Sequence, residues 1–145
     1  EFRRVLFRSA LWDWRAQSQG LPLWQLLGGA QARVPLYTTE GGWLHLSPQA
    51  LVDQTLEAQA QGFKGAKIKI GRPHVSEDVA RLSAVRDAVG PGFELMTDAN
   101  QGFNRAEAVR RVRAFDGLGL AWMEEPLPAE DVSGHRQLRE HTTVR

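Results

Sequence analysis

The chain has 145 residues, 42% of them hydrophobic, with a formal net charge of +1 and no cysteine. This length suits one ordinary domain rather than two, and the near-zero charge gives no electrostatic reason to expect a nucleic acid or a membrane as partner. The lack of cysteine excludes disulfides and thiolate metal sites. No apolar run approaches the roughly 18–20 residues of a membrane span, and no signal core follows a basic start, so we expect a cytoplasmic enzyme.

The first nine residues, EFRRVLFRS, are unlike the rest of the chain. They resemble a common sequencing-library adapter translated in frame. The alternative is a short basic, amphipathic start. We assign residues 1–9 to the adapter, leave them out of the fold prediction, and expect the natural N-terminus to be missing.

From Ala10 onward, helix and strand signals alternate along the chain. Residues 10–31 are expected to form a helix and a short turn of helix that ends at Gly28 and Gly29. Beyond them, each strand-like run is followed by a helical run. Strands are predicted over 33–39, 65–70, 93–99 and 120–126, and helices are predicted to begin at Ser47, Ser76, Asn104 and about Asp131.

This unbroken alternation is typical of an α/β protein with a parallel sheet covered by helices. No GxGxxG or GxxxxGK[ST] motif follows any of the strands, which argues against a nucleotide-binding fold. A TIM-type (β/α) barrel fits better, and a complete one needs about 250 residues. We therefore predict a partial barrel of about four βα units over residues 32–145.

The run GAKIKIG, residues 65–71, carries two lysines in a strand-like pattern. Ile68 and Ile70 fall on one face of such a strand, and Lys67 and Lys69 fall on the other. Strands of a barrel are covered by helices outside and packed inside, so neither face meets bulk water. The isoleucines suit the helical cover, and the lysines must then point inward, where a charge needs partners.

Partners for these lysines stand at the ends of the next two strands. Lys69, Asp98 and Glu124 occur at three successive strand ends, 29 and 26 residues apart. Each alone has an ordinary explanation, as a solvated lysine, a turn or a loop carboxylate. Because the carboxyl ends of barrel strands open on one mouth, their repetition at the same point of three units predicts that they converge.

Such a cluster has a chemical use. Carboxylate oxygens suit Mg²⁺, and a lysine beside another ammonium is expected to have a lowered pKa, so that it can act as a base. Together they could remove a proton α to a carboxylate and stabilise the resulting enediolate.

With these motifs the chain resembles the enolase superfamily, in its mandelate racemase/muconate-lactonizing branch. The resemblance covers nearly all of residues 10–145, from ALWDW and GLPLWQLLGG through KIKIG, DAN and EEP. It implies the first half of a (β/α)7β barrel. By this match Lys69 is the base, Lys67 its electrostatic neighbour, Asp98 and Glu124 two metal ligands, and Asn100 a polar residue beside the active centre.

The resemblance leaves other features open. It gives no ligand role to Glu125, which we expect to lie next to the metal ligands without contacting the metal. His45, in the first βα loop, either touches substrate or is a solvated loop histidine. The family's N-terminal capping domain, third metal ligand and later acid/base groups have no match; the next ligand is expected at about position 150, beyond Arg145. We therefore expect this chain to be inactive by itself, with the inward-facing Met96 and Trp122 partly unburied.

The substrate class is predicted from local similarity. MEEP, YTTEGGWLH and EDVSGH resemble stretches of galactarate/talarate-type acid-sugar dehydratases, which remove an α-proton and eliminate the β-hydroxyl as water. Racemases, epimerases and cycloisomerases of the same branch are the alternatives. The resemblance implies Mg²⁺ as cofactor, a small-molecule carboxylate as substrate, and a homo-oligomeric parent enzyme.

Two interpretations outside this family are alternatives. A glycosidase barrel also places carboxylates at strand ends, but it has no use for an amine base. A non-catalytic half-barrel that binds a partner would expose an apolar patch of several hundred Å², and so would any incomplete barrel.

Overall fold

The computed structural model describes residues 2–31 and 33–144. The chain divides into two compact units, with the boundary in the sequence between Val34 and Pro35. The first unit contains α1 (Phe2–Ser18) and α2 (Leu23–Leu26). The predicted helix from Ala10 thus begins earlier, inside the segment that we assign to the adapter. Helix α2 ends as expected at two glycines with positive φ, and the second, Gly29, donates its N–H to the Trp24 carbonyl at 2.9 Å.

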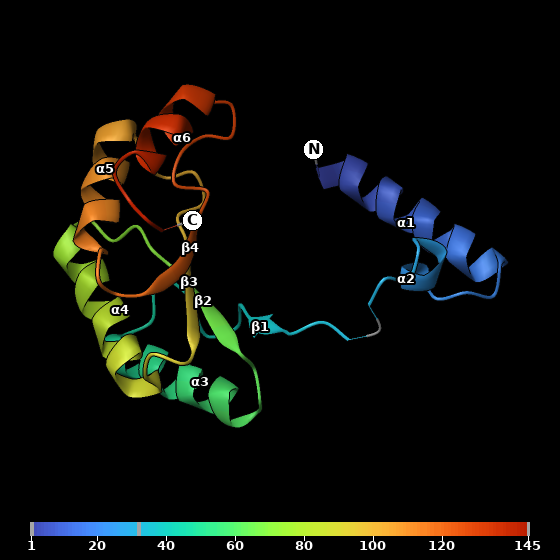
Figure 1. Cartoon of the computed structure of the whole chain (residues 1–145), viewed down its shortest axis with the longest axis horizontal. Helices are drawn as coiled ribbons and strands as arrows, with labels where there is room; N and C mark the ends of the chain where they lie inside the picture. Colours follow the sequence, from blue (N-terminus) through green and yellow to red (C-terminus); the bar gives the residue numbers. More distant parts are fainter. Residues whose placement is uncertain (1, 32, 145) are drawn as a thin grey trace. The chain divides into compact units, whose positions relative to one another are not determined.

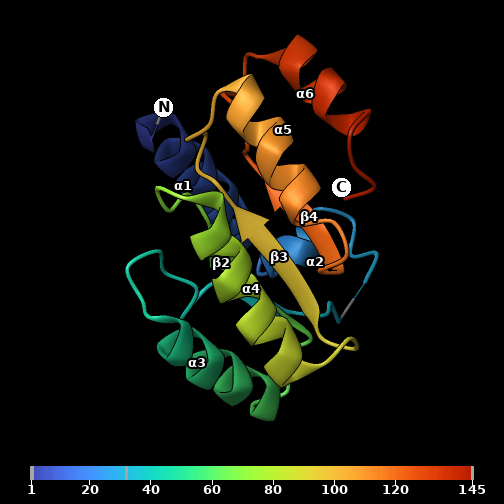
Figure 2. The same ribbon diagram turned by 90° about the vertical axis from the view of Figure 1, so that its left-hand side faces the viewer.

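The second unit is a four-stranded parallel sheet with strand order β1-β2-β3-β4. Helices α3, α4 and α5 lie along one face of this sheet, as Figures 1 and 2 show from two sides. The elements alternate in chain order as β1 (Tyr37–Thr38), α3 (Pro48–Ala60), β2 (Gly65–Lys69), α4 (Val75–Val89), β3 (Glu94–Asp98), α5 (Arg105–Ala114), β4 (Leu120–Glu124) and α6 (Val132–Arg139). This is the predicted α/β partial barrel.

The hydrophobic core lies between the sheet and its helices. Ile68 and Leu95 are fully buried there, and Ile70 is 3% exposed. Leu82 and Val85, one turn apart on α4, pack into the same core. The alternation in β2 therefore works as predicted: the isoleucines face the helices, which leaves the lysines for the opposite, concave face.

The helices begin mostly where the sequence indicates. Ser47 caps α3 by accepting the N–H of Ala50 at 3.2 Å, and Asn104 caps α5 by accepting the N–H of Glu107 at 2.9 Å. Helix α4 is an exception, because its N-cap is His74 and not Ser76. The carboxylate of Glu77 accepts the His74 N–H at 2.9 Å, and this contact starts the helix two residues earlier than predicted.

Strand β1 is much shorter than the predicted 33–39. It pairs with β2 only at Gly65 and Ala66. Residues 33–36 are exposed, and Pro35 among them has no N–H to donate to a neighbouring strand. Because β1 ends at Thr38, residues 67–69 of β2 have no described strand beside them on that edge.

The sheet curves toward the face that carries the lysines. The rings of Tyr37 in β1 and Trp122 in β4 meet there edge to face, with centroids 5.5 Å apart, whereas the outer strands of a flat sheet would lie about 14 Å apart. Trp122 is partly exposed, as expected, but Met96 is 0% exposed, which contradicts the expectation for that residue. Its register neighbours on the concave face, Lys67 and Trp122, flank it on both sides.

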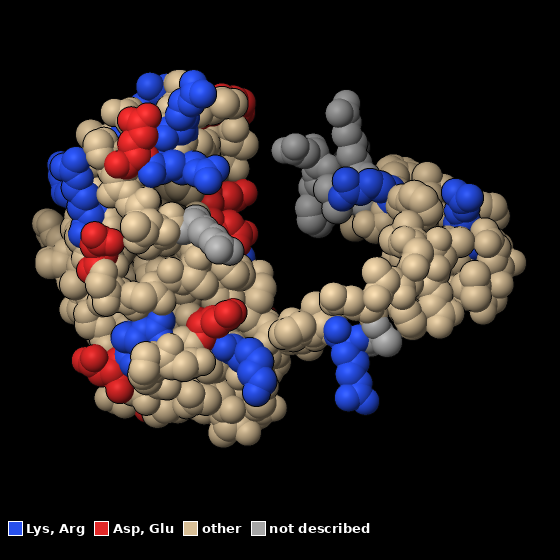
Figure 3. Space-filling view, viewed as in Figure 1, with Lys and Arg blue, Asp and Glu red and all other residues tan. Residues whose placement is uncertain are grey.

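The surface shows no broad area of one charge sign on the side seen in Figure 3, where acidic and basic side chains of the second unit lie interspersed. None of the described helices is both long and apolar enough to cross a membrane.

Candidate active site

Four charged side chains meet on the concave face, at the carboxyl ends of β2, β3 and β4. The parallel register places Lys69 beside Asp98, and Asp98 beside Glu124. Lys67 lies two residues before Lys69 on the same face of β2. The convergence predicted from the equal spacing of the βα units is therefore present in the fold.

Each ammonium group contacts a carboxylate directly. Lys69 Nζ donates to Asp98 Oδ2 at 2.6 Å. Lys67 Nζ donates to Glu124 Oε2 at 2.8 Å and lies 3.4 Å from Asp98 Oδ2. Asp98 thus contacts both lysines, whereas Glu124 contacts Lys67.

Burial and charge act in opposite directions on these groups. Burial alone would raise the pKa of Asp98, but the Lys69 hydrogen bond, the Asn100 N–H and the two lysine charges lower it below its usual value. Burial likewise would lower the pKa of Lys67, but the hydrogen bond to Glu124 and the charges of Glu124 and Asp98 raise it above the usual value. Near neutral pH, Asp98 is therefore ionised and Lys67 keeps its proton.

Asn100 joins this cluster from the loop after β3. Its Oδ1 accepts a hydrogen bond from Lys69 Nζ at 2.7 Å, and its main-chain N–H donates to Asp98 Oδ1 at 2.9 Å. The residue has a φ of 47°, a left-handed conformation that asparagine tolerates better than most residues. The turn thus holds the Asp98 carboxylate and the Lys69 ammonium together.

The other two predicted site residues lie in different surroundings. His45, from the loop after β1, lines a cavity of about 600 Å³ that Lys69 and Asn100 also line. Glu125 is exposed and contacts Gln101 rather than the lysines, with 3.5 Å between Gln101 Nε2 and Glu125 Oε1. It lines a hollow beside α6, on the helical side of the sheet. Glu125 is therefore not brought to the lysine–carboxylate cluster.

The carboxylates suit a hard divalent cation. Asp98 and Glu124 end neighbouring strands and offer oxygen ligands only, and Mg²⁺ is commonly held by one or two protein carboxylates together with water and substrate oxygens. No group of three Asp, Glu, His or Cys side chains able to hold a metal occurs in the described part of the chain. Asp98 and Glu124 thus fit two ligands of such an ion.

Two features of the site escaped the sequence prediction. The Gly42 carbonyl accepts the Lys69 N–H at 2.7 Å, and a Cβ at Gly42 would lie 2.1 Å from the Lys67 carbonyl oxygen, so only glycine fits there. Behind β2, Arg81 donates to the Lys69 carbonyl at 2.9 Å. The GG pair at 41–42 was a visible signal, whereas an arginine within a helix gave none.

Comparison with known proteins relates this chain to one family. The sequence profile of the family described as Enolase C-terminal domain-like matches residues 50–145. L-talarate/galactarate dehydratase of Salmonella typhimurium is 44% identical over 129 residues, 89% of this chain and 32% of the enzyme. The 3,6-anhydro-alpha-L-galactonate cycloisomerase of Streptomyces coelicolor is 40% identical over 130 residues, 89% of this chain and 36% of that enzyme.

Solved structures agree with the sequence comparison. The Salmonella typhimurium dehydratase, liganded with Mg and L-lyxarohydroxamate, superposes with a TM-score of 0.87 at 42% identity, covering 93% of this chain and 34% of that one. The chain spans about a third of the length of the relatives that it matches. On its sequence and its fold, the chain belongs to the Enolase C-terminal domain-like family, in the mandelate racemase/muconate-lactonizing branch of the enolase superfamily.

Proposed function

We propose that the whole protein containing this chain is a Mg²⁺-dependent carbon–oxygen lyase that dehydrates an acid sugar. The observation that carries the proposal is the contact of two lysines with two strand-end carboxylates at one mouth of a parallel sheet. The dehydratase and cycloisomerase relatives act on acid sugars by name, which favours this substrate class. We expect the enzyme to work in the cytoplasm as a homo-oligomer.

Each residue of the cluster has a role in this reaction. Lys69, once its Nζ has lost a proton, takes the proton from the carbon next to the substrate carboxylate, and Asp98 and Asn100 fix the position of its amine. Lys67 remains charged and supplies a fixed positive charge beside the carbon that is deprotonated. Asp98 and Glu124 would hold Mg²⁺, which stabilises negative charge on the substrate carboxylate when bound.

The elimination step completes the proposed reaction. Loss of the α-proton to Lys69 leaves an electron pair that forms the new carbon–carbon double bond, while the β-hydroxyl takes a proton from a general acid of the whole protein and leaves as water. The resulting enol becomes a 2-keto-3-deoxy acid. His45 lines the cavity beside Lys69 and is proposed to contact the substrate.

A second candidate is an isomerase of the same branch. L-Ala-D/L-Glu epimerase of Bacillus subtilis is 35% identical over 136 residues, 92% of this chain and 36% of that enzyme. An epimerase would share the removal of the α-proton but return a proton to the other face without losing water. The product therefore separates the two candidates.

Lys69→Met in the whole protein tests the shared step. We expect exchange of the α-proton of galactarate with deuterium from the solvent, followed by NMR, to fall at least about 10³-fold, while Mg²⁺ binding measured by calorimetry stays nearly unchanged. Lys64→Met is the matched control, because Lys64 is exposed just before β2 and should leave exchange intact. Undiminished exchange in the Lys69 variant would exclude this lysine as the base.

A further inference from the structure

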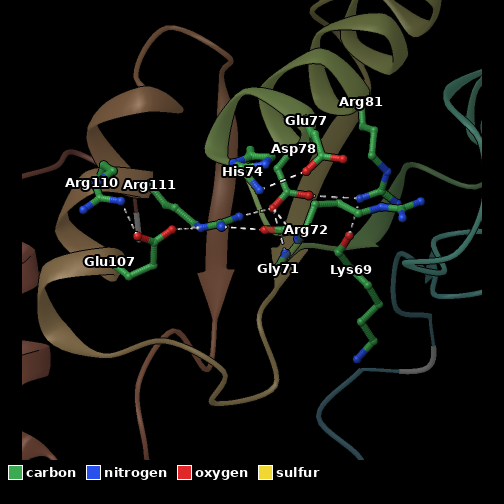
Figure 4. A network of polar contacts seen from close by, with 10 residues as sticks. All are labelled: Lys69, Gly71, Arg72, His74, Glu77, Asp78, Arg81, Glu107, Arg110 and Arg111. Atoms are coloured by element: carbon green, nitrogen blue, oxygen red, sulfur yellow. Dashed lines mark hydrogen bonds and ion pairs between the residues drawn. The ribbon is translucent and has the colours of Figure 1, made fainter.

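A buried charge network lies behind β2, on the other side of the main chain from the Lys69 ammonium (Figure 4). Its centre is Asp78, which is 0% exposed, and its two cations are Arg81 and Arg111, at 3% and 2%. Asp78 Oδ1 accepts from Arg81 Nη1 at 3.2 Å, and Asp78 Oδ2 accepts from Arg111 Nη1. None of these three side chains belongs to the lysine–carboxylate cluster, so the proposed reaction does not use them directly.

The network holds the chain that follows Lys69. Asp78 Oδ2 accepts the main-chain N–H groups of Gly71 at 2.7 Å and Arg72 at 3.2 Å. Arg111 Nη2 donates to the Arg72 carbonyl at 2.7 Å. The turn that leaves β2 is therefore tied to α4 and α5 through both its N–H and its carbonyl groups.

Arg81 makes the contact that reaches Lys69 itself. Its Nη1 donates to the Lys69 carbonyl at 2.9 Å, and its Nη2 donates to the Trp43 carbonyl at 3.1 Å. Strand β1 pairs with β2 only at its first two residues, so Arg81 supplies the donor that a longer β1 would have offered. It also joins β2 to the segment that follows Gly42.

These contacts fix the peptide group between Lys69 and Ile70 from both sides. The Lys69 carbonyl is held by Arg81, and the Ile70 N–H donates to the Asp98 carbonyl at 3.0 Å. Because the orientation of this peptide sets the direction of the Lys69 side chain, it also sets where Nζ meets Asp98 and Asn100.

Burying the charged Arg81 side chain at this position costs free energy. Burial lowers the pKa of Arg81, against the opposing effect of the Asp78 charge, and its buried Nε has no hydrogen-bond partner among the described residues. A protein in which well-packed apolar side chains replace a buried ion pair is often as stable as the original, or more stable. Stability alone therefore does not account for an arginine whose donors reach the carbonyl of the proposed base.

We propose that Arg81, oriented by Asp78, is a positioning residue for Lys69: it holds the main chain of the proton-abstracting lysine without touching substrate. The proposal rests on the proposed function of Lys69. Its structural part, that Arg81 fixes the Lys69–Ile70 peptide, can be tested independently of any activity.

The structural part is tested on the 145-residue chain by amide hydrogen exchange measured by NMR. In Arg81→Met, we expect the Ile70 N–H to exchange at least about tenfold faster, because the peptide loses one of its two anchors. Leu95, which is fully buried in β3, should keep its protection, which shows that the variant folds. Arg136→Met is the matched control, since the Arg136 side chain is exposed and makes no hydrogen bond or ion pair with a described residue. Unchanged exchange at Ile70 would overturn the proposal.

Should Arg81→Met fail to fold, as unprotected Leu95 would show, Arg81→Lys decides the structural part. It keeps a charge beside Asp78 but has one short donor group instead of the planar fork that reaches both the Lys69 and Trp43 carbonyls. We expect intermediate exchange at Ile70, and exchange at the rate of the unchanged chain would overturn the proposal.

The functional part is tested in the whole protein with α-deuterated galactarate. Misplacing Lys69 should lower kcat for dehydration at least about tenfold in Arg81→Met, leave KM within about threefold, and raise the deuterium isotope effect on kcat, because proton transfer becomes the slow step. Arg81→Lys should recover part of kcat, and Arg136→Met should retain it. If kcat falls only by the fraction of enzyme that is unfolded and the isotope effect is unchanged, Arg81 merely stabilises the fold. That result would overturn the proposal. An unaltered enzyme that exchanges no α-proton would instead refute the proposed function.

Discussion

At the scale of single residues, the two carboxylates of the site are unequal. Asp98 is 4% exposed and contacts both lysines, whereas Glu124 is 38% exposed and contacts Lys67. Removing a buried partner leaves uncompensated charge, while removing an exposed one leaves a group that water can solvate. We therefore expect the loss of Asp98 to destabilise the fold more than the loss of Glu124.

Asp98→Ala should therefore lower the free energy of unfolding of the chain by about 3 kcal/mol. Glu124→Ala should lower it by less than about 1 kcal/mol, because Lys67 keeps Asp98 nearby. Urea unfolding followed by circular dichroism measures both values without any metal. Equal losses would mean that Asp98 does not hold both lysines in solution.

Gly42→Ala should disturb the site from the backbone. The new Cβ would meet the Lys67 carbonyl oxygen at 2.1 Å, so either the loop or β2 must move, at a cost of about 1–3 kcal/mol. Gly92→Ala is the matched control, since a Cβ there meets no heavy atom within 4 Å. Unfolding of both variants in urea is the measurement, and a Gly42 variant as stable as the Gly92 variant would contradict the close approach.

At the scale of elements, α6 is attached to α5 through an ion pair. Asp131 caps α6 by accepting the Gly134 N–H at 3.0 Å, and its other oxygen accepts from Arg105 Nε at 2.7 Å. The hydrogen bond from Arg105, that from Gly134 and the Arg105 charge lower the pKa of Asp131 to about 2. A single carboxylate thus both starts a helix and attaches it to its neighbour.

Acid should loosen this attachment over a defined range. A carboxyl group with a lowered pKa stabilises the fold fully above its unfolded value of 3.8, and this contribution is lost as pH falls toward about 2. We expect amide exchange in α6, corrected for its intrinsic pH dependence, to lose protection between these values before α4 does. Asp131→Asn should remove this step, and an α6 in the unchanged chain that is equally protected at pH 4 and pH 2 would contradict it.

At the scale of the whole molecule, the described sheet has two outer strands with a neighbour on one side only, β1 and β4. Unpaired strand edges favour pairing with another copy. Two carboxylates of the cluster, without a third described ligand, would leave a Mg²⁺ ion bound there largely hydrated.

The 145-residue chain alone should therefore self-associate and bind Mg²⁺ weakly, with a dissociation constant of about 1 mM or higher. It should not dehydrate galactarate. Sedimentation velocity over a range of concentrations, calorimetric titration with Mg²⁺ and an assay for the keto acid product test these three expectations. A monomer that turns over galactarate would show that the described residues already hold the complete catalytic machinery.

The sequence by itself determined the order of the elements and the family. Local signals are sufficient for this: period-two alternation in β2, the caps at Ser47 and Asn104, and the glycines that end helices. It also predicted that Lys67, Lys69, Asp98 and Glu124 meet, because equal βα units bring equivalent strand ends to one mouth of a barrel.

The tertiary structure alone decided how these residues are held. Strand β1 comprises Tyr37–Thr38, because its ladder with β2 is limited to Gly65 and Ala66, and Met96 is buried because the sheet curves over it. Asp98 as the partner of both lysines, and Arg81 as the anchor of the Lys69 carbonyl, depend on contacts between residues up to 31 positions apart. Periodicity along a chain assigns a side chain to a face, but the partner that it finds there depends on how the sheet bends and which helix lies behind it.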